Sequence, residues 1–256
     1  MGKDRQVRAY ELDTMRGIAM IFVIFMHVSW DLKYMFRLAD CAWLDAQWFE
    51  GLMHPFFLVT FVGVSGMCCT FSRNNVKRGL KLISVALALT AGTAVATYVF
   101  HMSCLIIFNV LHLLSCGIFL YALIEFIEKK TKAPSKKANA IMGFLGAFAI
   151  IIGDTISNFN HHVDNPLLIP TGIIMDCTPG MADYMPLFPW IGVFFVGVVI
   201  GRVCYKEKNT LFPPKHNFVR KITAPFEFIG RHSLLIYIAH QPIVMLICYL
   251  ISEAVK

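Results

Sequence analysis

ELDTMRGIAMIFVIFMHVSWDL, residues 11–32, has the composition of a membrane helix but contains two residues that are unusual in one. It is apolar from Gly17 to Trp30, yet Arg16 stands at its start and His27 well inside it. An ionisable side chain in hydrocarbon costs free energy, so such residues usually have a partner and a function. We therefore expect a first membrane-spanning helix that also contributes to a functional site.

The composition of the whole chain is that of a membrane protein. Of its 256 residues 57% are hydrophobic and 15% are charged, whereas soluble domains have about 45–50% apolar and about 25% charged residues. A helix needs about 20 residues to cross the bilayer core. We expect an all-α integral membrane protein, a polytopic bundle of about seven transmembrane helices that forms a single domain over residues 1–256. The expected spans are residues 16–35, 50–71, 82–100, 103–125, 138–156, 186–204 and 230–251.

The distribution of lysine and arginine predicts the orientation. Of the 23 such residues, 20 fall in segments on the side of the N-terminus, and only Lys33, Arg37 and Lys256 fall on the other side. The positive-inside rule then predicts a cytoplasmic N-terminus, an extracytoplasmic C-terminus and an odd number of spans. The net charge of +7 is a topology signal beside anionic lipids rather than a nucleic-acid patch. We expect a multi-pass protein of the inner membrane whose partner is the bilayer and not nucleic acid.

The two polar residues of the first span share one face. Arg16 and His27 are 11 residues apart, which is close to three helical turns and roughly 16 Å along the axis. Asp31 follows His27 by one turn, where it could accept an imidazole N–H and fix the tautomer. The simpler interpretation is an interfacial arginine that snorkels and a histidine bonded to a neighbouring helix.

Two later spans repeat parts of this arrangement. His112 in the fourth span and His240 in the seventh are expected at a depth similar to that of His27. Arg231 stands at the cytoplasmic end of the seventh span, and Tyr237 lies on the same helical stripe as His240. Each histidine could serve packing alone, but three imidazoles at a similar depth favour a functional role, whether or not they converge.

Further polar residues lie near the outer ends of the spans. His54 falls in the first turn of the second span, where capping is as reasonable as catalysis. Pro186 and Pro189 withhold backbone donors at the start of the sixth span, beside Asp183 and Trp190. This entry is therefore expected to be bent or unwound and to line a cavity rather than lipid.

No metal site is expected. The eight cysteines form no CxxC pair, and most lie in apolar runs where a thiol behaves as a small hydrophobe. His161, His162 and Asp164 could hold an exterior metal ion, but a solvated loop is the preferred interpretation. The chain has no phosphate-binding loop, no dinucleotide fingerprint and no hydrolase or metalloprotease motif.

Four segments resemble one family. LDTMRGIAMIFVIFMHVSWDL, VLHLLSCGIFLYAL, DYMPLFPWIGVFFVGVVIGR and IGRHSLLIYIAHQPI are similar to the bacterial family that shares the catalytic domain of heparan-α-glucosaminide N-acetyltransferase. The resemblance runs in order from the first span to the last, over essentially the whole chain. The spacing of Arg16 and His27 is also similar to the first helix of the broader transmembrane acyltransferases that O-acetylate surface glycans.

The resemblance implies acyl transfer across a membrane. Cytosolic acetyl-CoA would be the donor, and a sugar or cell-envelope glycan on the far side would be the acceptor. Arg16 and Arg231 would suit the phosphates of CoA. His27 would act as general base or be acetylated itself, with Asp31, His112 and His240 as further catalytic candidates. The acceptor side is assigned to His54, Asp183, Trp190 and Tyr237.

The assignment of the base follows the wider superfamily. The glycan acyltransferases have their essential histidine at the position that matches His27, whereas the lysosomal enzyme takes its histidine from the following outer loop. Here that loop, residues 33–49, contains no histidine, so the heparan substrate is not carried over. The alternatives are a transporter whose histidines relay protons and a membrane scaffold without chemistry. Paired cations at the inner ends of two spans favour the enzyme, and a homo-oligomer is compatible with the sequence.

Overall fold

The computed structural model describes residues 9–102, 104–158, 165–173, 181, 183–212 and 217–255. Within these residues all regular structure is helical and there is no strand, as the sequence predicts. The chain divides into two compact units. The first unit combines the residues up to Val64 with those from Glu207 onward, and the second unit runs from Ser65 to Lys206. The prediction of one domain over residues 1–256 concerns the assembly of these units and stays a prediction.

The first unit is built around its N-terminal helix. α1 (Tyr10–Trp30) is continued by a π-turn, Asp31–Met35, so that one rod of helix extends over the whole first span. The remaining elements of this unit are the short turns Ala42–Asp45 and Phe49–Met53, α2 (His54–Cys69), which continues past Val64, α7 (Asn217–Arg231) and α8 (Ser233–Val255).

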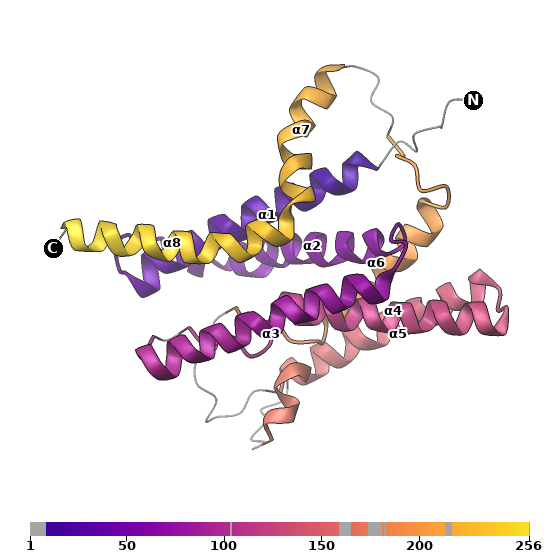
Figure 1. The fold of residues 1–256 in the computed structure, drawn as a ribbon, viewed down its shortest axis with the longest axis horizontal. Helices are drawn as coiled ribbons and strands as arrows, with labels where there is room; N and C mark the ends of the chain where they lie inside the picture. The colour runs from indigo at the N-terminus through magenta and orange to yellow at the C-terminus, as the bar shows by residue number, and fades with distance from the viewer. Residues whose placement is uncertain are drawn as a thin grey trace. The chain divides into compact units, whose positions relative to one another are not determined.

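Two helices pack on α1 at different levels. α7 crosses the N-terminal part of α1, and α8 lies along its C-terminal part (Figure 1). The crossing is close because glycines stand where the helices meet: a Cβ on Gly17 would overlap the backbone of Phe226, and one on Gly230 would overlap the backbone of Asp13. Small residues allow such backbone approach between helices. α7 lies in what the sequence analysis treats as a cytoplasmic loop, although its apolar residues recur with a helical period.

The second unit contains two closely packed helix pairs. α3 (Asn75–Phe100) lies along α4 (Val110–Thr131), and α5 (Ser135–Asn158) lies along α6 (Trp190–Cys204). Gly146 and Gly192 face one another in the second pair, since a Cβ on Gly192 would overlap the carbonyl oxygen of Gly146. A short 3₁₀ turn, Pro166–Thr171, precedes α6.

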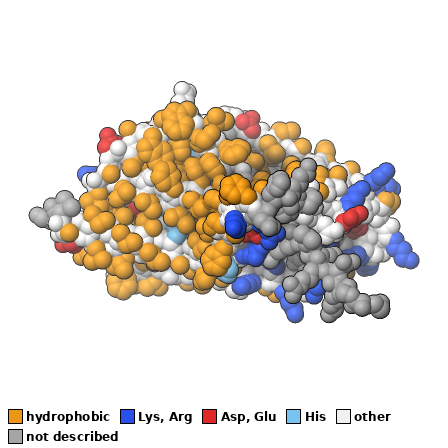
Figure 2. Space-filling model, turned by 90° about the horizontal axis from the view of Figure 1, so that it is seen from above, with side chains coloured by type: hydrophobic (Ala, Val, Ile, Leu, Met, Phe, Trp, Pro, Cys, Tyr) orange, Lys and Arg blue, Asp and Glu red, His pale blue; other side chains and the backbone are white. Residues whose placement is uncertain are grey.

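Among the residues that the structure describes, six helices are long and apolar enough to cross a membrane, which supports a polytopic membrane protein. The expected sixth span, residues 186–204, is shorter: α6 has 15 residues, about 22 Å of helix against a hydrocarbon core of about 30 Å. Its first expected turn is not helical, as the prolines predict, because Pro186 and Pro189 supply no backbone donors. The exposed surface is rich in large hydrophobic side chains (Figure 2), as a lipid-facing surface requires.

Candidate active site

α1 and α8 bring two of the expected histidines into direct contact. Nε2 of His240 lies 2.9 Å from Nδ1 of His27, and the ring centroids are 4.9 Å apart. His240 is 7% exposed, while His27 is half-buried. The two residues are 213 positions apart in the chain, so the pair exists only because α8 returns to the C-terminal part of α1.

The direction of the hydrogen bonds follows from a backbone carbonyl. Nδ1 of His240 lies 2.7 Å from the carbonyl oxygen of Tyr237, and a carbonyl can only accept, so Nδ1 carries the hydrogen. In a neutral ring Nε2 of His240 then accepts, and Nδ1–H of His27 is its donor. The network therefore assigns the basic lone pair of the neutral pair to Nε2 of His27.

The next residue of α8 makes a second link to α1. Gln241 Nε2 donates to Oδ2 of Asp31 at 2.9 Å, and Asp31 is 2% exposed. Oε1 of Gln241 is buried and has no hydrogen-bond partner among the residues that the structure describes. His240 and Gln241 thus hold two positions of α1 that are one turn apart. That Asp31 orients His27 stays a prediction. Gln241 was not among the expected residues, although its place beside His240, as a second polar residue in an apolar run, could have indicated it.

Two further expected residues of the first unit, His54 and Tyr237, lie on α2 and α8. His54 is the first residue of α2, is half-buried, and stacks on Phe49 with ring centroids 6.5 Å apart. Tyr237 is buried, with its ring 5.5 Å from that of His240. Both residues belong to the same compact unit as the histidine pair.

The two expected anion-binding arginines lie where α7 crosses α1. Arg16 Nη1 donates to the carbonyl oxygen of Gly230 at 3.2 Å. Arg231 contacts two buried carboxylates: its Nε lies 3.3 Å from Asp13 Oδ2, and its Nη2 lies 2.8 Å from Glu227 Oε2. The formal charges of the two arginines and the two acids cancel, so Arg231 serves first to hold α7 on α1. Neither acid was among the expected residues: Asp13 precedes the expected first span, and Glu227 lies in a segment that was expected to be a loop because its mean hydropathy is low.

His112 belongs to the second unit and has a local partner. The sequence predicts a fourth span from residue 103, but α4 begins at Val110, so His112 lies in its first turn. Asn109 is the N-cap, and His112 completes a capping box with it: Nδ1 lies 2.9 Å from Asn109 Oδ1 and 3.3 Å from its backbone nitrogen. Nε2 lies 3.5 Å from Thr90 Oγ1. These contacts satisfy the start of a helix, and convergence of His112 with His27 stays a prediction.

The segment that precedes α6, together with the first residue of α6, contains the remaining expected residues. Asp183 is exposed and left-handed, with φ of 50°, and Trp190 is the half-buried first residue of α6. Between them the hydroxyl of Tyr184 donates to the carbonyl oxygen of Ile169 at 2.5 Å, and burial raises the pKa of Tyr184 above its ordinary value. His161, His162 and Asp164 lie outside the described residues. Within the described part of the chain, no group of three or more His, Cys, Asp or Glu side chains could hold a metal ion.

An ion pair near the surface connects the loop after α1 to the π-turn that continues this helix. Lys33 Nζ donates to Oδ2 of Asp45 at 2.5 Å, and the hydroxyl of Tyr34 donates to Oδ1. The hydrogen bond from Lys33, followed by that from Tyr34, holds the pKa of Asp45 below its ordinary value. The loop after α1 is thus fastened to the end of the helix that carries His27.

Comparison with known proteins places the chain in a family. The family model described as heparan-alpha-glucosaminide N-acetyltransferase, catalytic, matches residues 8–242, which includes all of α1 and ends just after His240 and Gln241. No curated protein and no solved structure gives a significant match to the chain. The family match and the six apolar helices make this a multi-pass membrane protein with the character of an acetyltransferase. The chain belongs to the heparan-α-glucosaminide N-acetyltransferase catalytic-domain family.

Proposed function

We propose that the protein transfers an acetyl group from acetyl-CoA to a hydroxyl or amine of a sugar, with His27 at the centre of the reaction. The observation that carries this proposal is the contact between His27 and His240, whose hydrogen-bond direction leaves Nε2 of His27 as the basic nitrogen. The family match supports acetyl transfer over the alternatives of a transporter or a scaffold. The same match includes the helix that carries His27.

As a general base, Nε2 of His27 would take the proton of the acceptor while the acceptor oxygen or nitrogen attacks the thioester carbonyl. The new bond to carbon forms, the carbon–sulfur bond breaks, and the imidazolium returns the proton to the thiolate of CoA. His240 exchanges no proton. Its Nε2 lone pair, 2.9 Å from Nδ1 of His27, stabilises the positive charge that His27 gains, as an orienting group does in a catalytic triad.

As a nucleophile, the same Nε2 would attack the thioester carbonyl, the carbon–sulfur bond would break, and the CoA thiolate would leave acetyl-histidine behind. The acceptor would then attack the acetyl carbon, the bond from this carbon to Nε2 would break, and the acceptor's proton would pass to the thiolate. The tautomer is the same, because a neutral imidazole attacks through the nitrogen that lacks a hydrogen. The two routes differ in one observable: only the second gives a covalent adduct at His27 when acetyl-CoA is supplied without acceptor. Acid quenching followed by mass spectrometry separates them.

The charge distribution supports cytoplasmic entry of the donor and an acceptor on the extracytoplasmic side of the inner membrane. Arg16 is the better candidate for a CoA phosphate, since Arg231 is shared between Asp13 and Glu227 and Nε of Arg16 is buried with no partner in the described structure. His54 and Tyr237 are the acceptor candidates of the same unit as the histidine pair.

The test uses the purified full-length chain in lipid nanodiscs. Acetyl-CoA should raise the melting temperature, and His27→Ala should keep that shift while losing acetyl transfer to sugar acceptors. Arg16→Ala should instead weaken the shift. His101→Asn is the matched control, because His101 is an exposed left-handed residue after α3, a conformation that asparagine tolerates. Absence of any shift with saturating acetyl-CoA would contradict the proposal.

A further inference from the structure

One face of α7 is apolar and exposed. Phe218 is 69% exposed, Ile222 is 50% exposed and Phe228 is 62% exposed. At about 100° per residue these side chains fall, with two exposed neighbours, within an arc of about 120°. This exposed face of α7 consists of Phe218, Lys221, Ile222, Pro225 and Phe228. Large apolar residues on a soluble helix would normally face a core.

The rotation of α7 is fixed, so this face cannot turn inward. Glu227 is 4% exposed and bonds both Arg231 and Thr223, the latter at 2.9 Å. Arg231 in turn contacts Asp13 on α1, and Gly230 lies against the backbone of α1. Turning the apolar residues toward α1 would break the contact between Arg231 and the buried carboxylate of Asp13, which costs free energy.

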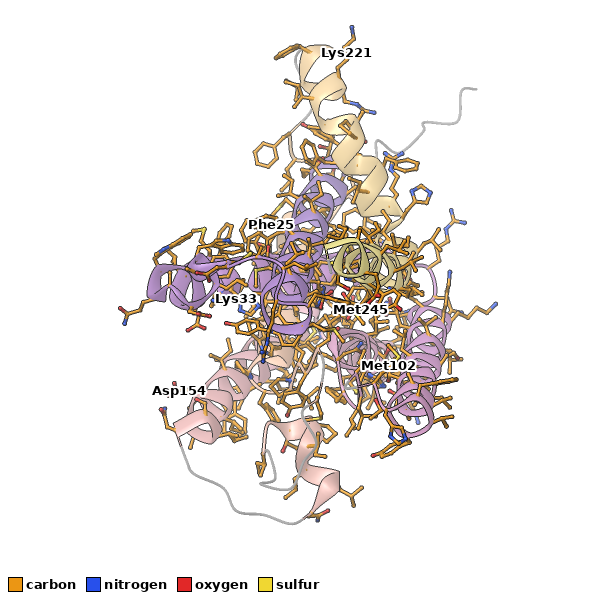
Figure 3. All side chains as sticks on the ribbon, turned by 90° about the vertical axis from the view of Figure 1, so that its left-hand side faces the viewer. Phe25, Lys33, Met102, Asp154, Lys221 and Met245 are labelled. Carbon is orange, nitrogen blue, oxygen red and sulfur yellow. The ribbon has the colours of Figure 1, made fainter. Side chains whose placement is uncertain are left out.

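The end of α7 is held at the start of a membrane helix. His232 is the single residue between α7 and α8, and α8 is long and apolar enough to span a bilayer. α7 runs across the direction of α8 in Figure 1, and in Figure 3, where α8 is seen nearly end-on, α7 extends away from it with Lys221 near its far end. A helix that stands across a spanning helix, one residue from its end, lies in the plane of the bilayer surface.

The charges of α7 indicate which type of lipid surface its exposed face would contact. Lys221 is exposed within the apolar face, while the one acid of α7, Glu227, is buried on another side. We propose that this face inserts into an anionic lipid leaflet, with Phe218 and Ile222 at the level of the acyl chains and Lys221 reaching the phosphates. A symmetric contact with a second copy would bring Lys221 close to its counterpart, which like charges oppose.

The experiment measures lipid contact of the full-length chain directly. A variant with its eight cysteines replaced receives either Ile222→Cys or Ala224→Cys and an environment-sensitive fluorophore. Ala224 is also exposed but lies about 160° around the helix from Ile222. Vesicles contain phosphatidylcholine alone or an equal mixture with phosphatidylglycerol, each with a trace of lipid spin-labelled near the headgroup. We expect the label at position 222 to shift to the blue and to be quenched, and the label at 224 to stay in water.

The charge is tested by Lys221→Glu in the Ile222→Cys background. Near an anionic surface one lysine changes the insertion equilibrium by about fivefold, so phosphatidylglycerol should increase quenching in the parent and not in this variant. Lys130→Glu, on an exposed position at the end of α4, is the control and should leave quenching unchanged. Equal quenching at 222 and 224, or a blue shift at 222 without quenching by lipid, would overturn the proposal. An unchanged response in Lys221→Glu would overturn its anionic part.

Discussion

Each unit contains an imidazole that contacts a polar partner: His27 with His240 in the first unit, and His112 with Asn109 in the second. The two pairs differ in how far apart their members are in the sequence. In the second unit the partner is three residues away and the contacts satisfy the first turn of α4. In the first unit the partner is 213 residues away on another helix. Helix capping accounts for the local pair. Capping does not account for the long-range pair, and because polar groups between apolar helices cost free energy, we expect that pair to have a function.

The largest expected effect tests the first pair. His27→Ala should reduce the rate of acetyl transfer by about 10²–10⁴, the usual contribution of a positioned acid or base, because Nε2 of His27 is the basic nitrogen. Steady-state rates with saturating acetyl-CoA measure it, against His101→Asn as control. Full activity in His27→Ala would mean that another residue is the base, and that the His27–His240 pair, like the Asn109–His112 pair, is not catalytic.

His240→Ala should lower turnover less, by about 10-fold to 100-fold, the range known for hydrogen-bond partners that orient metal-binding histidines, because it removes the group that orients His27 and not the basic nitrogen itself. The informative comparison is His240→Gln, since an amide oxygen can replace Nε2 as the acceptor for Nδ1–H of His27. Partial rescue by glutamine, with an unchanged KM for acetyl-CoA, would support the assigned direction of the hydrogen bond. Equal losses in both variants would count against it.

Gln241→Ala should reduce the free energy of unfolding by about 1–3 kcal/mol, because it removes the donor of a buried acceptor. Asp31 is 2% exposed and would lose the amide that now lies 2.9 Å away. Denaturation in mild detergent measures the change. Asn158→Ala is the control, since the amide of Asn158 bonds at an exposed position. A cost no larger than that of the control would show that the second link between α8 and α1 is dispensable.

His112→Ala should cost about 1 kcal/mol of stability, as for other residues that cap a helix. Its signature is coupling with Asn109→Ala: the double variant should cost less than the two single costs together, because both remove one capping box. Loss of turnover comparable to that of His27→Ala, without loss of stability, would contradict the structural role and bring His112 back as a catalytic residue.

The smallest expected effect concerns the exposed Lys33–Asp45 contact, which neither pair includes. The pKa of Asp45 is lowered in the folded protein, so its stabilisation is present above the unfolded pKa of about 3.9 and is lost as the pH falls through the folded pKa. Asp45→Asn should therefore melt slightly earlier than the parent at neutral pH, and the difference should vanish on acidification. A difference in melting temperature that grows toward low pH would contradict the predicted direction of this pH dependence.

The two histidines that meet between α1 and α8 could be singled out from the sequence, and the predictions that were wrong have physical causes. The apolar runs predict the spans, and His27 and His240 attract attention because ionisable residues are rare in them. The start of α4 was placed seven residues too early, since hydropathy registers apolar residues and not the Asn109 cap that ends the loop. α7 was missed because a basic, amphipathic segment between spans resembles a loop when only mean hydropathy is considered.

By itself, the sequence determined the class of protein, the approximate spans, the family and the asymmetric distribution of charge, because these depend on composition and local order. Only the tertiary structure decided which polar residues meet. That α8 sets His240 against His27 and Gln241 against Asp31, and that Arg231 is shared by Asp13 and Glu227, depends on helix packing between distant segments. Close packing at residues such as Gly17 and Gly230 fixes that register, and sequence spacing does not encode the contacts between separate helices.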